Sequence, residues 1–110
     1  MTRNRIFIAV VCVLLGIGAA QAQNLGAISG RVTDTSDAVV PGALAEIKNV
    51  DTGFTRTVTT GPQGDYRASE LPLGQYQIEV SFAGFQKVNR TGIQLTSGRD
   101  AVVNFQLTVG

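Results

Sequence analysis

The stretch from Leu71 to Phe82 places the tightest limit on how this 110-residue chain can fold. Pro72 and Gly74 interrupt regular structure, and apolar side chains then recur at every second position from Tyr76 to Phe82. A period of two is typical of a half-buried β-strand. A tyrosine just after such a corner can bury its ring while its hydroxyl bonds upstream backbone, as in Greek-key sandwiches. The sequence therefore predicts a structural corner at Pro72, Gly74 and Tyr76 that leads into a strand.

Short β patterns separated by turn residues fill the rest of the chain after residue 23. We expect strands over 28–33, 43–48, 55–60, 66–68, 76–82, 86–90 and 103–109. Pro41-Gly42, Gly61-Pro62 and Ser97-Gly98 are turn-forming pairs between them. No stretch shows a sustained helical period of apolar residues. This pattern predicts an all-β fold, an Ig-like antiparallel Greek-key β-sandwich of about seven strands.

The first 22 residues have the pattern of a secretory signal peptide. Arg3 and Arg5 precede an almost wholly apolar run from Ile6 to Ala20, and Ala20 and Ala22 are small residues at the positions that a signal peptidase reads. The apolar run would make a helix of roughly 22 Å, too short for a hydrocarbon core of ~30 Å. We therefore expect a signal-peptide helix over 1–22, cleaved after Ala22. The mature domain, residues 23–110, is then exported and does not span the membrane.

Composition argues against several classes of function. The sequence has no histidine and no tryptophan, and its single cysteine, Cys12, lies in the predicted signal peptide. Without histidine the serines lack the usual partner for nucleophilic catalysis. After removal of Arg3 and Arg5, seven of the nine Lys and Arg residues remain against eight Asp and Glu, with no basic stripe to favour nucleic acid. We expect no catalytic residues, no metal site, no cofactor and no nucleic-acid partner.

Acidic residues leave two alternatives open. Asp34, Asp37 and Asp51 could together hold calcium, but they lack the spacing of a calcium loop, and Asp is common at turns. Glu46 and Glu79 could form a catalytic carboxylate pair, but alternation places both on outward strand faces. We favour turn-forming and solvent-facing roles for these side chains.

Several of these segments, taken together, resemble the carboxypeptidase regulatory-like domain, a transthyretin-like or carbohydrate-binding-like sandwich. They read ISGRVTD (28–34), VPGA (40–43), NVDTG (49–53), TGPQGDY (60–66), LPLGQY (71–76) and GF (84–85). The resemblance covers about residues 26–109. Two turns depart from the family pattern: Asp37 stands where glycine is usual, and Gly61-Pro62 replaces an acidic turn.

The variety that this chain most resembles is the N-terminal domain of TonB-dependent outer-membrane receptors, in which a signal peptide is followed by this domain, a plug and a barrel. The resemblance implies a non-enzymatic interaction module, periplasmic or associated with the outer membrane, whose partner is an envelope protein or the receptor barrel. Since the chain stops at Gly110, we expect either a truncated receptor or a stand-alone module.

The alternative is a secreted carbohydrate-binding module. Sugar platforms use exposed aromatic rings, and most rings in this sequence fall at inward positions. Phe54 and Phe85 lie near turns and are the candidate ligand contacts. A row of outward threonines at 55, 57 and 59 gives a polar face that could dock a partner without aggregation.

Overall fold

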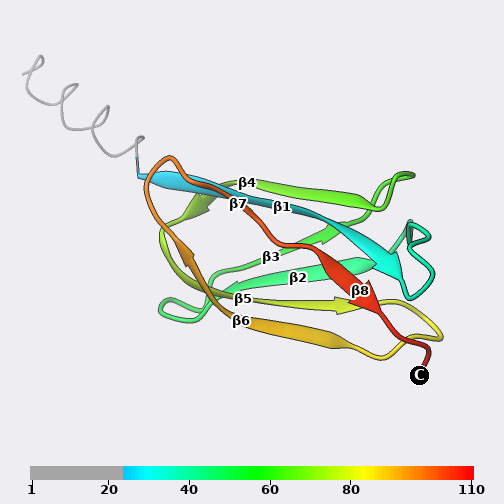
Figure 1. Cartoon of the computed structure of the whole chain (residues 1–110). Helices are drawn as coiled ribbons and strands as arrows, with labels where there is room; N and C mark the ends of the chain where they lie inside the picture. The colour runs from blue at the N-terminus through cyan, green and yellow to red at the C-terminus, as the bar shows by residue number, and fades with distance from the viewer. Residues whose placement is uncertain (1–23) are drawn as a thin grey trace, which may run out of the picture.

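The structure, a computed structural model, describes residues 24–110, which form eight strands and no helix. The strands are β1 (Leu25–Asp34), β2 (Leu44–Asn49), β3 (Thr55–Thr59), β4 (Asp65–Pro72), β5 (Gly74–Ser81), β6 (Val88–Leu95), β7 (Asp100–Val102) and β8 (Phe105–Leu107) (Figure 1). Within this range there is accordingly no helix with the length and apolarity needed to cross a membrane. The predicted signal peptide and its cleavage residues Ala20 and Ala22 lie outside the described residues.

The strands pack as two four-stranded sheets that face each other (Figure 1). The first sheet has the order β4–β1–β7, with β8 also paired to β1, and the second has the order β3–β2–β5–β6. Pairing in the second sheet is antiparallel throughout, and so is the β1–β4 pair. β7 and β8, in contrast, both run parallel to β1. The predicted all-β sandwich is confirmed, with a parallel joint between its first and last strands as the added feature.

The strand predicted over 103–109 is shorter in the structure, where β8 covers only Phe105–Leu107. The sequence pattern does not predict β7, Asp100–Val102, and residues 103 and 104 form a break between the two strands. At the break the Val103 N–H still donates to the Ser29 carbonyl at 2.8 Å. The Arg31 N–H, however, bonds Oδ1 of the Asn104 side chain at 3.0 Å instead of a main-chain carbonyl. Alternation cannot reveal such a break, because the apolar residues before and after it are buried as in a continuous strand.

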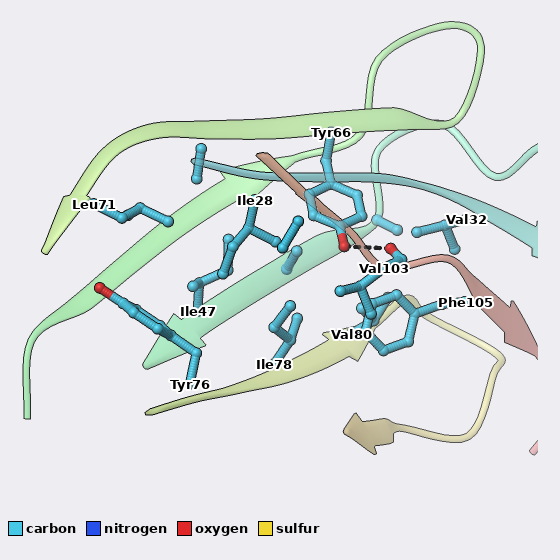
Figure 2. Close-up of a cluster of buried hydrophobic side chains, with 14 of the residues drawn as sticks. Ile28, Val32, Ile47, Tyr66, Leu71, Tyr76, Ile78, Val80, Val103 and Phe105 are labelled. Atoms are coloured by element: carbon cyan, nitrogen blue, oxygen red, sulfur yellow. Dashed lines mark hydrogen bonds between the residues drawn. The ribbon is translucent and has the colours of Figure 1, made fainter. Parts of the chain in front are cut away.

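The carbonyl of Val103 turns into the core at this break. There it accepts a hydrogen bond from the Tyr66 hydroxyl at 2.5 Å (Figure 2). The carbonyl occupies the space beside Gly30, where a Cβ would lie 1.8 Å from its oxygen and 2.9 Å from Tyr66 Cε1. Glycine is therefore required at position 30 by the close approach of another segment.

The core fills the space between the sheets (Figure 2). Its largest fully buried side chains are Tyr76, Ile28, Ile47, Leu71, Ile78, Leu95, Leu107, Val32 and Val80. The alternation predicted for β2 and β5 is confirmed up to Val80. Phe82 departs from it and is 38% exposed, because β5 ends at Ser81 and the chain turns away before Phe82 can enter the core.

Several strand boundaries also differ from prediction, most of all those of the fourth and sixth strands. The fourth strand, predicted over 66–68, runs over Asp65–Pro72. Ser69 and Glu70 form a bulge opposite a single β1 residue, and pairing with β1 resumes at Leu71. Glu70 adopts the left-handed conformation at this bulge, with φ of 57°. The sixth strand, predicted over 86–90, runs instead over Val88–Leu95. A bulge shifts the alternation of inward and outward residues by one position, so the part of the strand beyond the bulge no longer matches the expected pattern.

An arginine bridges the two sheets along each open side of the sandwich. Arg56 of β3 donates to the Ser69 carbonyl of β4 at 3.0 Å, and Arg90 of β6 donates to the Asn104 carbonyl at 3.0 Å. Each guanidinium also lies over an aromatic ring, that of Phe54 for Arg56 and that of Phe105 for Arg90. These contacts occupy edge carbonyls that could otherwise pair with a foreign strand.

Candidate ligand-binding surfaces

The corner that leads into β5 is held by side-chain and main-chain bonds. The Tyr76 ring is buried and its hydroxyl donates to the Pro72 carbonyl at 2.5 Å, which is the geometry of a tyrosine corner. Gly74 has a φ of 140°, and a Cβ there would lie 3.0 Å from both Asn49 Nδ2 and Asp51 Oδ2. Gly74 thus lies against the β2–β3 turn, Tyr76 pairs with Asn49 at the start of that turn, and Pro72 holds the Tyr76 hydroxyl. The Tyr76 ring is buried and offers no open face to a ligand.

Asn49, at the end of β2, is a buried polar residue that the sequence singles out only as the first residue of the segment NVDTG (49–53). Its Nδ2 donates to the Leu73 carbonyl at 3.2 Å, and its Oδ1 accepts the N–H groups of Asp51 at 2.9 Å and Thr52 at 3.2 Å. One side chain therefore closes its own turn and also holds the corner before β5. An Asn at the first position of a turn was the available signal, since Asn bonds backbone two residues ahead.

Phe54, the first candidate ligand contact, is half-buried against the core just before β3. The guanidinium of Arg56 lies 5.6 Å from its ring centroid. The Phe54 ring is thus covered by the core on one part and by the Arg56 guanidinium on another, so it is poorly placed to stack against a sugar.

Phe85, the second candidate, lies in the β5–β6 loop and is also half-buried. Its ring centroid is 6.0 Å from that of Phe82, at an interplanar angle of 47°. The two rings line a hollow of about 520 Å³, whose other lining residues are Gly42, Ser81, Ala83 and Lys87. We call this surface the Phe82–Phe85 hollow. Phe82, which the sequence pattern placed in the core, is the most exposed aromatic residue among residues 24–110.

The structure does not bring Phe54 and Phe85 together. Phe54 follows the turn at one end of the second sheet, whereas Phe85 lies in the loop at the opposite end (Figure 1). The pairing register agrees, since Thr55 pairs with the last part of β2 and Ser81 with its first residue. A small ligand could therefore touch only one of the two candidates.

A second hollow, of about 570 Å³, opens on the outer face of the first sheet beside the β7–β8 break. Its charged lining residues are Arg31, Asp65 and Arg67, and the last of these pairs with Asp100 at 3.1 Å. Tyr66 contributes to its floor but is itself buried, and burial raises the pKa of its phenol, which keeps the hydroxyl neutral as a hydrogen-bond donor. This hollow has charged residues in its lining and presents no exposed aromatic ring.

The turn aspartates do not converge on a common site. Asp34 Oδ1 accepts the Ser36 hydroxyl at 2.7 Å and the N–H groups of Ser36 at 2.8 Å and Ala38 at 3.1 Å. These bonds, led by that from the Ser36 hydroxyl, lower the pKa of Asp34. Asp51 instead accepts the Gln75 N–H, at the other end of the sandwich. Nowhere in the described part of the chain do three acidic, histidine or cysteine side chains group as metal ligands would.

Glu46 and Glu79 lie directly opposite each other on the outer face of the second sheet. Glu79 is solvent-accessible and lies 3.6 Å from the Lys87 ammonium group. The threonine row of β3 is exposed on the same face, as predicted. The face is thus polar and solvated, and both carboxylates face solvent, as the sequence favoured.

Solved structures of other proteins share the fold. The Bacillus anthracis TIE protein superposes with a TM-score of 0.67 and 23% identity, over 78% of this chain and 17% of that one. Wild-type catechol 1,2-dioxygenase of Acinetobacter radioresistens has a TM-score of 0.66 and 14% identity, over 83% of this chain and 54% of the enzyme. The dioxygenase domain of a dioxygenase–carbohydrate-binding protein fusion from Streptomyces sp. SirexAA-E has a TM-score of 0.63 and 14% identity, over 80% of this chain and 82% of that domain. At such identities the likeness is one of fold alone, and this chain spans only a fraction of the first two proteins.

The comparison with curated protein sequences found no match. A family model does match, over residues 27–108, and its description is the carboxypeptidase regulatory-like domain. The matched range runs from the third residue of β1 to just beyond β8 and so includes both sheets. With three quarters of its length matched, the chain belongs to the carboxypeptidase regulatory-like domain family.

Proposed function

We propose that this chain is a non-enzymatic interaction module of the bacterial cell envelope and that it binds through the Phe82–Phe85 hollow. The observation that carries the proposal is the exposure of Phe82 beside Phe85 on a sandwich whose other large rings are buried or covered. Among residues 24–110, every buried side-chain polar atom has a hydrogen-bond partner, so no other unsatisfied group marks a binding site inside the domain. Exposed aromatic residues in a hollow are typical anchors of protein interfaces.

We place the module at the N-terminus of a TonB-dependent outer-membrane receptor, in the periplasm or associated with the outer membrane. Two sequence features support this placement: the predicted signal peptide directly before the domain, and the resemblance of its turn segments to that receptor domain. The partner would then be an envelope protein or the receptor barrel. Genomic sequence after codon 110 tests the receptor origin, since an in-frame plug and barrel would support it and their absence would contradict it.

The binding surface is tested separately by site-specific photo-crosslinking in cells. A photoreactive residue at Phe82 should give a discrete adduct with an envelope protein, whereas the same residue at Thr57, on the polar face, should give none. Both positions are exposed, so neither replacement should disturb folding. Equal crosslinking from both positions, or none from either, would contradict docking at the hollow.

A second candidate function is a secreted carbohydrate-binding module, favoured by the same pair of rings. Phe82 and Phe85 line the hollow together with Ser81 and Lys87, which can donate hydrogen bonds to hydroxyl groups. A glycan panel compares the wild type with Phe82→Ala, Phe85→Ala and Phe54→Ala. A sugar bound in the hollow requires losses for the first two variants and none for Phe54→Ala, which lies at the opposite end. Flat signals for the wild type across the panel would end this reading.

A further inference from the structure

We propose that this domain is a force-bearing link, in which tension applied between its two ends is resisted by shear of β1 against β7 and β8. The observation is the parallel pairing of the first strand with the last two. β1 forms three register pairs with β7, beginning at Ala27↔Asp100, and three with β8, ending at Asp34↔Leu107. We call this set of pairs the terminal joint. The inference does not depend on what the Phe82–Phe85 hollow binds.

Parallel pairing decides how the terminal joint carries load. β1 begins at one end of the sandwich and β8 ends at the other, so a pull on the two ends slides the strands past each other (Figure 1). The hydrogen bonds of the joint lie across the direction of pull, and all of them must yield together. In an antiparallel pair pulled from one end, the bonds break one after another. Shear loading therefore gives a higher unfolding barrier, which is what governs forced unfolding.

Hydrogen bonds reach across the joint along its whole length. At its start the Ala27 N–H donates to the Arg99 carbonyl at 3.0 Å. The β7–β8 break would be its weak point, but the Asn104 side chain accepts the Arg31 N–H there and continues the ladder. At its far end Gln106 Nε2 donates to the Asp34 carbonyl at 3.2 Å.

Neighbouring strands also tie the C-terminal segment sideways at the break. Tyr66, from β4, donates to the Val103 carbonyl from within the core. Arg90, from β6 in the other sheet, donates to the Asn104 carbonyl. With both carbonyls engaged, the segment is held in place against peeling and must move by sliding.

Single-molecule force spectroscopy on the full chain tests the proposal by changing only the direction of pull. With Cys12→Ser in the background, handles at Asn24→Cys and Gly110→Cys load the terminal joint in shear. Handles at Thr35→Cys and Gln63→Cys lie in exposed turns at the adjacent ends of β1 and β4, an antiparallel pair, and load it by unzipping. We expect the end-to-end unfolding force to be at least twofold higher. Equal forces in the two directions would overturn the proposal.

A pair of variants tests the ladder itself. Asn104→Ala should lower the end-to-end unfolding force while changing the force between positions 35 and 63 little. Gln75→Ala is the matched control, because it removes an exposed bond to Gln94 in the other sheet and should leave the end-to-end force unchanged. An Asn104→Ala variant that weakens both directions equally would show a general loss of stability and contradict the proposal.

Discussion

The hydroxyl of Tyr66 and the carbonyl of Val103 meet inside the core, 2.5 Å apart, although 37 residues separate them in the chain. The carbonyl is available because the ladder between β1 and the last strands breaks at Val103 (Figure 2). Gly30 leaves the space in which the two groups meet. This arrangement joins β1, β4 and the break between β7 and β8 at one point, and the stability of the domain should be sensitive to each of the three residues.

Removal of the Tyr66 hydroxyl should destabilise the domain. In Tyr66→Phe the Val103 carbonyl stays buried without a donor, which costs about 1–3 kcal/mol of unfolding free energy. Urea denaturation measures the change. Tyr76→Phe, whose hydroxyl bond closes a local corner near the surface, should cost about 1 kcal/mol. Wild-type stability in Tyr66→Phe would show that the bond contributes nothing.

A side chain at position 30 should be far more damaging than one at an open glycine. In Gly30→Ala the new methyl group would overlap the Val103 carbonyl, and we expect a loss above about 3 kcal/mol or failure to fold. Gly53→Ala is the control, because Gly53 has a positive φ of 79°, which Gly30 lacks, but has nothing within 4 Å of its Cβ position. Its cost should be only the left-handed strain, about 1–2 kcal/mol. Thermal melts of the two variants compare them, and similar costs would contradict a steric role for Gly30.

Glycine at the β4 bulge should stabilise the domain. The left-handed conformation of Glu70, with φ of 57°, costs about 1–2 kcal/mol of strain. Glycine removes this strain but loses more backbone entropy on folding. Glu70→Gly should therefore raise the unfolding free energy by a few tenths to about 1 kcal/mol. Glu70→Ala keeps the strain and should show no such gain. A melting temperature lowered by Glu70→Gly alone would contradict the assignment.

Asp34 should contribute stability that depends on pH. Its folded-state pKa is lowered below the ordinary value of 3.8, so the contribution is complete above that pH and is lost as pH falls through the lowered value. Compared with Asp34→Asn, the wild type should be more stable at pH 7, and the difference should shrink in acid below about pH 4. Melting curves of both proteins across this range measure it. A difference independent of pH would assign the effect to something other than the carboxylate charge.

Much of the fold could be predicted from the sequence because alternation encodes which face of a strand is buried. Ile47, Ile78 and Val80 occupy the inward positions that a period of two assigns them. The turn-forming pairs separate the strands as expected, and the family resemblance agrees with the matched range. Alternation gives no information about burial beyond the end of a strand. The pattern therefore predicts Phe82 in the core, whereas the structure places it in the lining of an exposed hollow.

By itself the sequence determined the all-β character, the strand faces and the family of this chain. Only the tertiary structure decided that the last strands run parallel to the first, that they break at Val103, and that Phe54 and Phe85 lie at opposite ends. It also decided that Asn49 holds the corner before β5. The physical reason is that the local sequence pattern specifies which face of a strand is buried, but not which other strand lies beside it. Partners 24, 37 or 73 residues away are selected when the sheets pack and each buried polar group must find a bond.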